Sequence, residues 1–299
     1  MNLPGAIASG RLARLASALA ADEQTRLRQA YPYVFEVNWR RRALMTAVAA
    51  APVALLVFGF ATLDVSWTKV FAGIGRLGQF AALVLPPTFS TLSRLEAYLQ
   101  GLAETLAIAF LGTAAAAVLA VPLGFLAARN VIANPVAHFL IRRCLDTIRS
   151  VDVLIWALIW INVVGLGPFA GILAILTSDV GALGKLFSEA IEAADARAVE
   201  AVRSSGGNRL HGLRFGLYPQ VLPVFISQAL YFFESNTRSA TIIGIVGAGG
   251  IGLLFNDAIQ QLEWQHVAFL SLMILVTVAV IDLISSKLRF AVIGRSAPG

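Results

Sequence analysis

Hydrophobic and polar residues follow one another along this chain in long blocks. The first uninterrupted apolar block runs from Ala43 to Leu63. Its length of about 21 residues matches the number that an α-helix needs to cross the roughly 30 Å hydrocarbon core of a bilayer. The block is too long, and the segment before it too extended, for a cleaved signal peptide. We therefore predict a retained transmembrane helix here.

Further apolar blocks follow, and together with the first they predict about six membrane spans. The later blocks cover residues 102–128, 151–166, 168–188, 218–236 and 266–286. The sequence GLGP at 165–168 separates two of them, since glycine and proline together interrupt a helix. The pattern predicts an all-α integral membrane protein.

The polar segments between these blocks define the expected organisation of the chain. Residues 1–42 form a basic, amphipathic N-terminal extension, which we expect to be solvated in the cytoplasm. Residues 64–98 are predicted to be an extracytoplasmic loop with an interfacial helix near 68–84. Residues 99–290 form the predicted transmembrane core, which includes a long cytoplasmic loop at 189–217.

The distribution of basic residues predicts how the chain is oriented. Short cytoplasmic loops of membrane proteins are enriched in Lys and Arg. The segments 1–42, 129–150 and 189–217 contain most of these residues, whereas residues 237–265 contain only Arg238. Three basic residues in the loop 64–98 weaken this contrast without reversing it. Both termini are therefore predicted to be cytoplasmic, and 237–265 to lie outside or to enter the membrane from there.

Composition excludes several other classes of protein. Hydrophobic residues make up 58% of the chain and charged residues only 13%, about half the charged share of a typical soluble domain. The net charge of +6 comes from basic clusters between apolar blocks, which indicates membrane orientation rather than nucleic-acid binding. Cys144 is the lone cysteine and the three histidines are scattered, so we expect neither a disulfide nor a metal site.

A glycine-rich segment at 245–255 poses a specific question. Gly247, Gly249 and Gly252 fit the G-x-G-x-x-G pattern of dinucleotide-binding turns. That fold needs an acidic residue about 20 positions later, and Leu272 stands there within an apolar block. We instead expect Gly247, Gly249 and Gly250 to permit non-helical backbone at membrane depth. They serve either as a gate or only as a close-packed turn.

Another notable group of polar residues comes just before the glycines, at Glu234, Asn236 and Arg238. Glu234 and Arg238 are four residues apart and share one face of a helix. One interpretation is a salt bridge at the outer end of the span. The other is that Arg238 and Asn236 line a path for an anion, with Asp179 lining the same path or pairing with Arg238.

The loop at 189–219 is long, charged and helix-prone. Gly206-Gly207 interrupts it, which predicts a short helix, a turn and a second helix. Such a helix at the membrane face is suited to dock into the groove of a partner. Pro219 suits the first turn of the next span.

This loop resembles the coupling loop of ABC importer permeases, which reads Glu-Ala-Ala, three residues, Gly, nine residues, Ile-x-Leu-Pro. Glu200, Ala201, Gly206 and Pro219 match that pattern at their positions. Its second Ala, its Ile and its Leu are replaced, in that order, by Val202, Gly216 and Tyr218.

A narrower resemblance extends over about residues 85–286. The sequences GLGPFAGILAI at 165–175, YPQVLP at 218–223 and YFFESNTRSATIIGIVGAGGIG at 231–252 resemble permeases of phosphonate/phosphate-type ABC importers. The resemblance implies the type I ABC importer permease fold in a bacterial inner membrane. It implies transport of phosphonate, phosphate or phosphite rather than enzyme activity.

The same resemblance implies several partners. A dimer of ATPase subunits would hold ATP-Mg, an extracytoplasmic binding protein would deliver the solute, and a second copy of this chain would complete the path. No cofactor is expected on the chain itself. Glu200, Ala201, Gly206 and Pro219 would transmit motion from the ATPase. The alternatives are a permease for another small solute, such as an amino acid, and a channel or carrier without an ATPase, which would have no need of the 189–219 loop.

Overall fold

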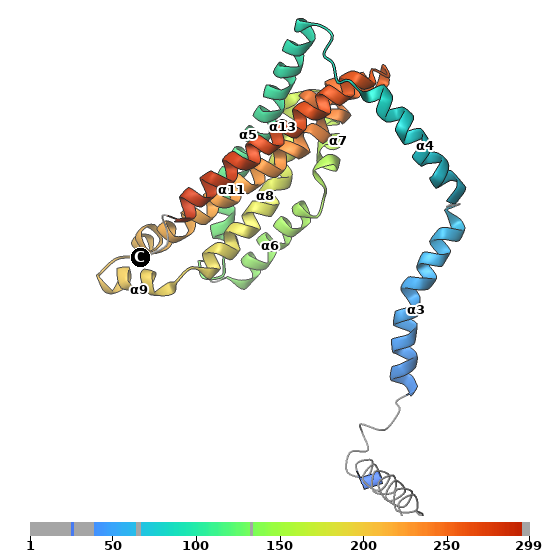
Figure 1. The fold of residues 1–299 in the computed structure, drawn as a ribbon. Coiled ribbons are helices and arrows are strands. Elements are labelled where there is room, and N and C mark those ends of the chain that lie inside the picture. The colour runs from blue at the N-terminus through green and yellow to red at the C-terminus, as the bar shows by residue number, and fades with distance from the viewer. Residues whose placement is uncertain (1–24, 27–38, 64–66, 132–133, 295–299) are drawn as a thin grey trace, which may run out of the picture. The chain divides into compact units, whose positions relative to one another are not determined.

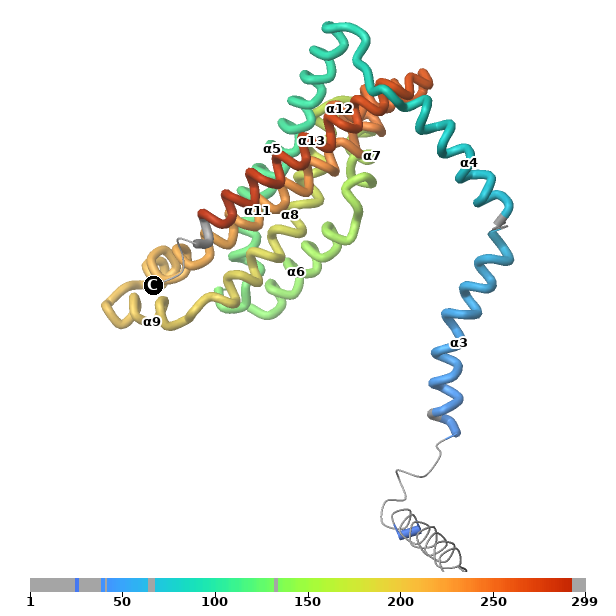
Figure 2. Tube along the Cα trace, viewed as in Figure 1, coloured from blue at the N-terminus to red at the C-terminus, as the bar shows by residue number. Residues whose placement is uncertain are grey.

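The computed structural model describes residues 25–26, 39–63, 67–131 and 134–294. Figures 1 and 2 follow the course of the chain. It divides into two compact units, residues 1–76 and 77–299, which are treated separately here. Most of the predicted N-terminal extension, residues 1–42, lies outside the described residues.

The described part of the first unit is dominated by helix α3 (Trp39–Thr62). Its segment Arg42–Thr62 is long and apolar enough to cross a membrane. Most of its apolar side chains are exposed, as in a helix that faces lipid. Helix α4 (Trp67–Val84) follows in the segment where the sequence predicts an additional helix.

The second unit consists of helices, and no strand occurs in the described part of the chain. The long helices are α5 (Leu92–Ala127), α8 (Pro168–Ala193), α11 (Tyr218–Ile243) and α13 (Trp264–Gly294). The shorter ones are α6 (Pro135–Arg149), α7 (Val153–Val164), α9 (Ala196–Ser204), α10 (Arg209–His211) and α12 (Ile251–Gln260), with π-helical turns η1 (Gly212–Leu217) and η2 (Gly244–Ala248). Figure 1 shows α5, α8, α11 and α13 forming one bundle.

The number of membrane spans agrees with the sequence prediction. Four helices within the described residues are long and apolar enough to cross a membrane, and the count rises to six if each of two bent pairs is one span. One pair is α6 with α7, bent by 87°, and the other is the 209–248 segment with α12, bent by 58°. The predicted all-α membrane protein with about six spans is therefore confirmed.

Small residues hold α5 and α8 close together. A Cβ atom at Gly112 would lie 2.8 Å from the side chain of Ile175, and one at Gly124 would lie 2.8 Å from Phe187. Ala116 and Ala120 are fully buried in the same contact. Close approach of backbones replaces the hydrophobic driving force that helices lack in lipid. This packing fixes the position of α5 against α8.

Several boundaries differ from the prediction. Helix α5 begins at Leu92, inside the predicted loop at 64–98. The basic segment 129–150, predicted to be a connection, contains helix α6, which begins where the Asn134 side chain accepts the backbone N–H of Val136 at 3.0 Å. The predicted loop at 189–217 begins too early, because α8 continues to Ala193. Helix α11 continues to Ile243, seven residues beyond the apolar block, and the hydroxyl groups in this extension bond to carbonyls of the same helix, as Thr237 does to Phe233 at 2.9 Å.

Candidate functional site

The helix-turn-helix predicted within 189–219 is present at one end of the bundle. The Asp195 side chain accepts the Arg197 N–H at 2.9 Å and begins α9. Gly206 ends the following turn with φ +86°, a conformation that favours glycine. Glu200 and Ala201 are both exposed. The predicted coupling residues thus form an exposed surface rather than part of the core.

One of the departures from the coupling pattern, Gly216, has a structural reason. A Cβ atom there would lie 2.8 Å from Val199 Cα and 3.0 Å from the Ala198 carbonyl oxygen. The backbone of α9 therefore rests directly on η1, and any side chain larger than hydrogen would separate them. Pro219 lies in the first turn of α11, as predicted.

Sequence reasoning missed Gln220, which ties this surface to α11. Its Oε1 accepts the Asp195 N–H at 3.0 Å, and its Nε2 donates to the Asp195 carbonyl at 3.1 Å and to the Gly216 carbonyl at 2.7 Å. One amide thus joins the start of α9, the end of η1 and the start of α11. Asp195 lies 25 residues before Gln220, and no local pattern indicates that pair.

The predicted glycine break lies at the opposite end of the bundle, where Figure 2 places α12. Gly247, Gly249 and Gly250 have φ of 105°, 84° and 73°, so the expected non-helical backbone is confirmed. Thr105 on α5 fastens the break: its hydroxyl accepts the Ile251 N–H at 2.8 Å and donates to the Gly101 carbonyl at 2.9 Å.

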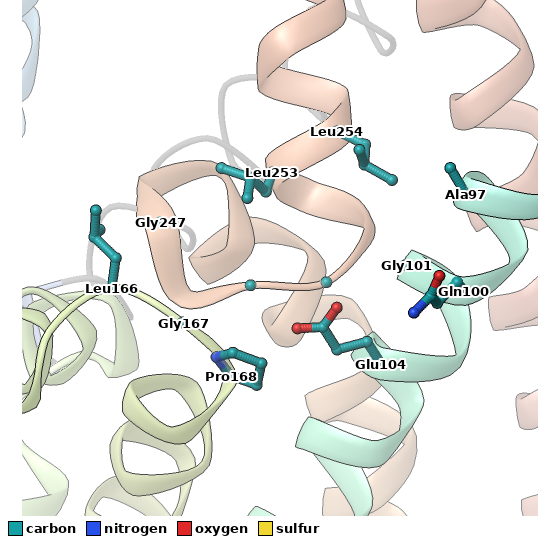
Figure 3. Close-up of a pocket in the computed structure, with 12 residues that line it drawn as sticks. Ala97, Gln100, Gly101, Glu104, Leu166, Gly167, Pro168, Gly247, Leu253 and Leu254 are labelled. Carbon is teal, nitrogen blue, oxygen red and sulfur yellow. The ribbon is translucent and has the colours of Figure 1, made fainter. Parts of the chain in front are cut away.

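The glycines line a cavity of 420 Å³ between α5, the α7–α8 turn and the start of α12. Figure 3 shows Glu104 of α5 pointing toward the glycine turn, with Leu166 and Pro168 on the opposite wall of the cavity. A Cβ atom at Gly249 would lie 2.8 Å from Glu104 Oε1 and 3.0 Å from the Pro168 nitrogen. Sequence reasoning did not select Glu104, because its position beside the glycines depends on the contact between α5, α8 and α12.

The Glu234 carboxylate lies between two arginines. Arg238 Nη1 is 3.6 Å from Oε1, and Arg289 Nη1 of α13 is 2.8 Å from Oε2. The predicted Glu234–Arg238 salt bridge is present, but it lies well inside α11 rather than at its end. Arg289 was not predicted, since the sequence placed it beyond the last span.

Asn236 lies on the other side of α11 and is buried. Its Nδ2 donates to Thr113 Oγ1 at 2.7 Å and to Asp179 Oδ2 at 2.5 Å. The suggested Asp179–Arg238 pair is therefore wrong, and Asp179 instead joins α8 to α11 through Asn236. A buried carboxylate inside a span needs such a donor because no water is there to solvate it.

A second polar group fastens the start of α5 to the start of α13. Arg94 donates to both carboxylate oxygens of Glu263, at 2.7 and 3.2 Å, and this hydrogen bonding lowers the pKa of Glu263 below that of an ordinary carboxyl. His266 Nδ1 lies 2.9 Å from the Tyr98 hydroxyl. Among the described residues no cluster of His, Cys, Asp or Glu is suited to a metal ion.

Comparison with known proteins places this geometry in context. The family model described as "Binding-protein-dependent transport system inner membrane component" matches residues 120–293. The phosphite transport system permease protein PtxC of Stutzerimonas stutzeri is 35% identical, over 85% of this chain and 91% of its own length. HtxC of the same bacterium, provisionally named a phosphite transport permease, is 37% identical over 88% of this chain and 92% of its own length.

Another relative and two solved structures extend the comparison. The phosphate-import permease protein PhnE of Mycolicibacterium smegmatis is 34% identical over 84% of this chain and 47% of its own length. A structure of the MetNI methionine ABC transporter superposes with a TM-score of 0.60 at 20% identity, over 68% of this chain and 99% of that chain. A structure of an amino acid ABC transporter gives 0.56 at 19% identity, over 70% and 100%. These likenesses confirm the predicted type I ABC importer permease fold.

Proposed function

Because this chain belongs to the family of binding-protein-dependent transport system inner membrane components, we propose that it is the permease subunit of an ATP-driven importer for phosphite, phosphate or phosphonates. One observation carries the substrate class: relatives named for phosphite and phosphate transport match 85% and 84% of this chain. The chain is a multi-pass protein of the inner membrane.

We propose that two copies of the chain assemble around one path. Each copy presents one α9 surface, and a two-fold pair of ATPase subunits would require two such surfaces. The ATPase subunits bind and hydrolyse ATP-Mg, and an extracytoplasmic binding protein delivers the anion. In this arrangement α9 and both termini are cytoplasmic, and the glycine break lies toward the outside.

In the proposed cycle the coupling residues transmit closure of the ATPase dimer to the spans. The exposed Glu200 and Ala201 contact the ATPase, Gly206 provides the turn after α9, and Pro219 begins the helix that moves. Glu200 is suited to pair with a basic group of the ATPase.

The path is proposed to follow α11, with Glu234 and Arg238 along it and Asn236 supporting it from the opposite face of the helix. Asn236 contributes by holding α11 against Thr113 and Asp179. Gly247, Gly249 and Gly250 form the gate, because they are the point where α11 turns into α12 beside a cavity.

The test is uptake of phosphite, phosphate and methylphosphonate by the complete complex in proteoliposomes. Glu200→Arg is expected to abolish uptake of all three while the permease dimer stays intact, because the reversed charge repels the basic partner on the ATPase. Size-exclusion chromatography checks the dimer, and normal uptake by this variant contradicts the coupling assignment.

A matched charge reversal separates coupling from general damage. Asp257 is exposed on α12, at the end of the bundle away from α9. Asp257→Arg is expected to keep the ATPase subunits bound during purification, whereas Glu200→Arg loses them. Uptake of methionine or histidine in place of the phosphorus anions by the wild-type complex would overturn the proposed substrate class.

A further inference from the structure

Polar side chains form a continuous stripe along α11. The members of this stripe are Ser227, Gln228, Tyr231, Glu234, Ser235 and Arg238, which recur at three- and four-residue spacing. That spacing places them on one face of the helix. Tyr231 and Arg238 are exposed although they lie within a candidate span. An accessible polar row inside a span faces water or protein rather than lipid.

A cavity of 370 Å³ adjoins the cytoplasmic half of this stripe under the proposed orientation. It is lined by Leu186, Ser227, Gln228, Tyr231, Phe232 and Arg289. The Arg289 guanidinium lies 5.9 Å from the Tyr231 ring centroid, so α13 supplies the cation of a cavity whose other polar groups come from α11. Neutral hydroxyl and amide groups beside a guanidinium are suited to contact an oxyanion.

The two arginines at Glu234 are held very differently. Arg289 donates a hydrogen bond to the carboxylate at 2.8 Å, and its side chain is 22% exposed. Arg238 lies 3.6 Å from the other oxygen, beyond hydrogen-bond distance, and its side chain is 50% exposed. The Glu234 side chain itself is only 9% exposed. The three groups carry a net charge of +1, and Arg238 is the cation that the carboxylate holds loosely.

We propose that Arg238 binds the passing oxyanion and that Arg289 is a fixed counter-cation that keeps Glu234 from holding Arg238 tightly. This inference rests on the proposed transport of phosphorus oxyanions and names the group that contacts them within the membrane. When no substrate is bound, the Glu234 carboxylate pairs with Arg238 in place of the substrate anion. When the anion binds, it replaces the Glu234 carboxylate as the partner of Arg238, and Arg289 alone neutralises Glu234.

The charge arrangement makes a distinctive prediction for Arg289. If its charge is removed, the buried Glu234 carboxylate has Arg238 as its nearest counter-charge. A buried carboxylate that has lost its closest partner binds the remaining cation more tightly. Arg238 then becomes unavailable to the anion, although Arg289 itself lies on a different helix. Removing the carboxylate as well releases Arg238 again.

The experiment measures the KM for uptake of labelled phosphate and phosphite by the complete complex in proteoliposomes. Arg238→Gln and Arg289→Gln are each expected to raise KM by about tenfold or more, the loss of one charge-assisted contact. The double variant Glu234→Gln with Arg289→Gln is expected to return KM to within about threefold of the wild type. Arg238→Lys keeps the charge and is expected to raise KM less than Arg238→Gln does.

Arg143→Gln is the matched control, because Arg143 forms a similar exposed pair with Asp146 at 3.7 Å on α6. It is expected to leave KM unchanged. An unchanged KM in Arg238→Gln overturns the inference. So does a double variant whose KM is as high as that of Arg289→Gln, provided that its dimer and its basal ATPase activity are normal. If the wild-type complex takes up neither anion, the proposed function fails first and this inference fails with it.

Discussion

The two ends of the bundle both interrupt a helical segment with glycines, yet the two breaks have different requirements. At Gly206 the backbone needs a positive φ, and a Cβ atom would have no neighbour within 4 Å. At Gly249 and Gly250 the φ is also positive, but a Cβ atom would meet Glu104, Pro168 and Thr105. Gly206 therefore requires only a conformation, and its neighbour Gly207 only empty space, because a Cβ atom at Gly207 would lie 2.7 Å from the Val202 carbonyl oxygen. Gly249 and Gly250 each require both.

This difference corresponds to the proposed roles of the two ends. A surface that docks a partner needs a defined turn and open space around it, as Gly206 provides. A gate must pack directly against the neighbouring helices when it is closed, and the glycines at 249–250 allow that contact. The π-helical turn η2 directly precedes Gly249, and η1 follows the short helix α10 after Gly206-Gly207. Such turns are frequent at functional sites.

The largest effect is expected from Gly250→Ala. Its φ of 73° and ψ of −166° are nearly restricted to glycine, and the added methyl group would collide with the Thr105 hydroxyl. We expect a loss of about 2–6 kcal/mol in the free energy of unfolding, from backbone strain plus overpacking. Thermal unfolding of the detergent-solubilised dimer measures it. A change no larger than that of Gly206→Ala would show that the break tolerates a side chain.

An intermediate effect is expected from Gly216→Ala, which tests the contact beneath α9. The backbone conformation there is ordinary, so only the contact with Val199 and Ala198 is disturbed. We expect about 1–3 kcal/mol of destabilisation and a larger loss of ATP-driven uptake, because α9 is moved off η1. Comparing uptake with ATPase activity measures this uncoupling.

Gly206 supplies the control for that experiment. Gly206→Ala is expected to cost about 1–2 kcal/mol through its positive φ alone, and Gly206→Asn less, because asparagine adopts this conformation more easily. Gly206→Asn, which keeps the turn, should keep uptake coupled to ATP hydrolysis, whereas Gly206→Ala should lose part of the coupling because it strains the turn. Uncoupling by Gly206→Asn would indicate that the partner approaches this glycine closely, so that space matters at Gly206 as well.

The smallest effect concerns the Arg94–Glu263 pair, which fastens the end that carries the glycine break. Because the pKa of Glu263 is lowered in the folded protein, its contribution to stability is fully present above the ordinary carboxyl pKa of about 4.3. It is lost as the pH falls through the lowered value. Wild type should therefore have the higher Tm than Glu263→Gln at pH 7, and the difference should shrink below about pH 4. A difference that persists unchanged in acid would exclude the charge as its source.

The sequence was sufficient for features that depend on local pattern. The apolar blocks identified the spans, Gly206-Gly207 identified the turn after α9, and Gly249-Gly250 identified the break before α12. Each of these follows from hydropathy or from backbone freedom, which neighbouring residues determine. The helix α6 was missed because its charged face resembles a connecting loop in composition.

The candidate sites were predictable only in part. Arg289 lies 55 residues from Glu234, and Asp179 lies 57 residues from Asn236. Which helices become neighbours depends on small-residue packing such as Gly112 against Ile175, and periodicity does not encode that choice. The sequence therefore identified Glu234, Asn236 and Arg238 as polar residues in a span. Of its two interpretations of Asp179, the pair with Arg238 was wrong, because Asp179 bonds to Asn236.

The three hydrogen bonds of Gln220 have a mechanical consequence. At about 0.5–1.5 kcal/mol each, they hold the Asp195 backbone and the end of η1 to the first turn of α11 with several times the thermal energy. The joint is therefore stiff, and little of a displacement applied to α9 is taken up as slack before α11 moves. In the proposed cycle, this joint would pass a displacement of α9 directly to the first turn of α11.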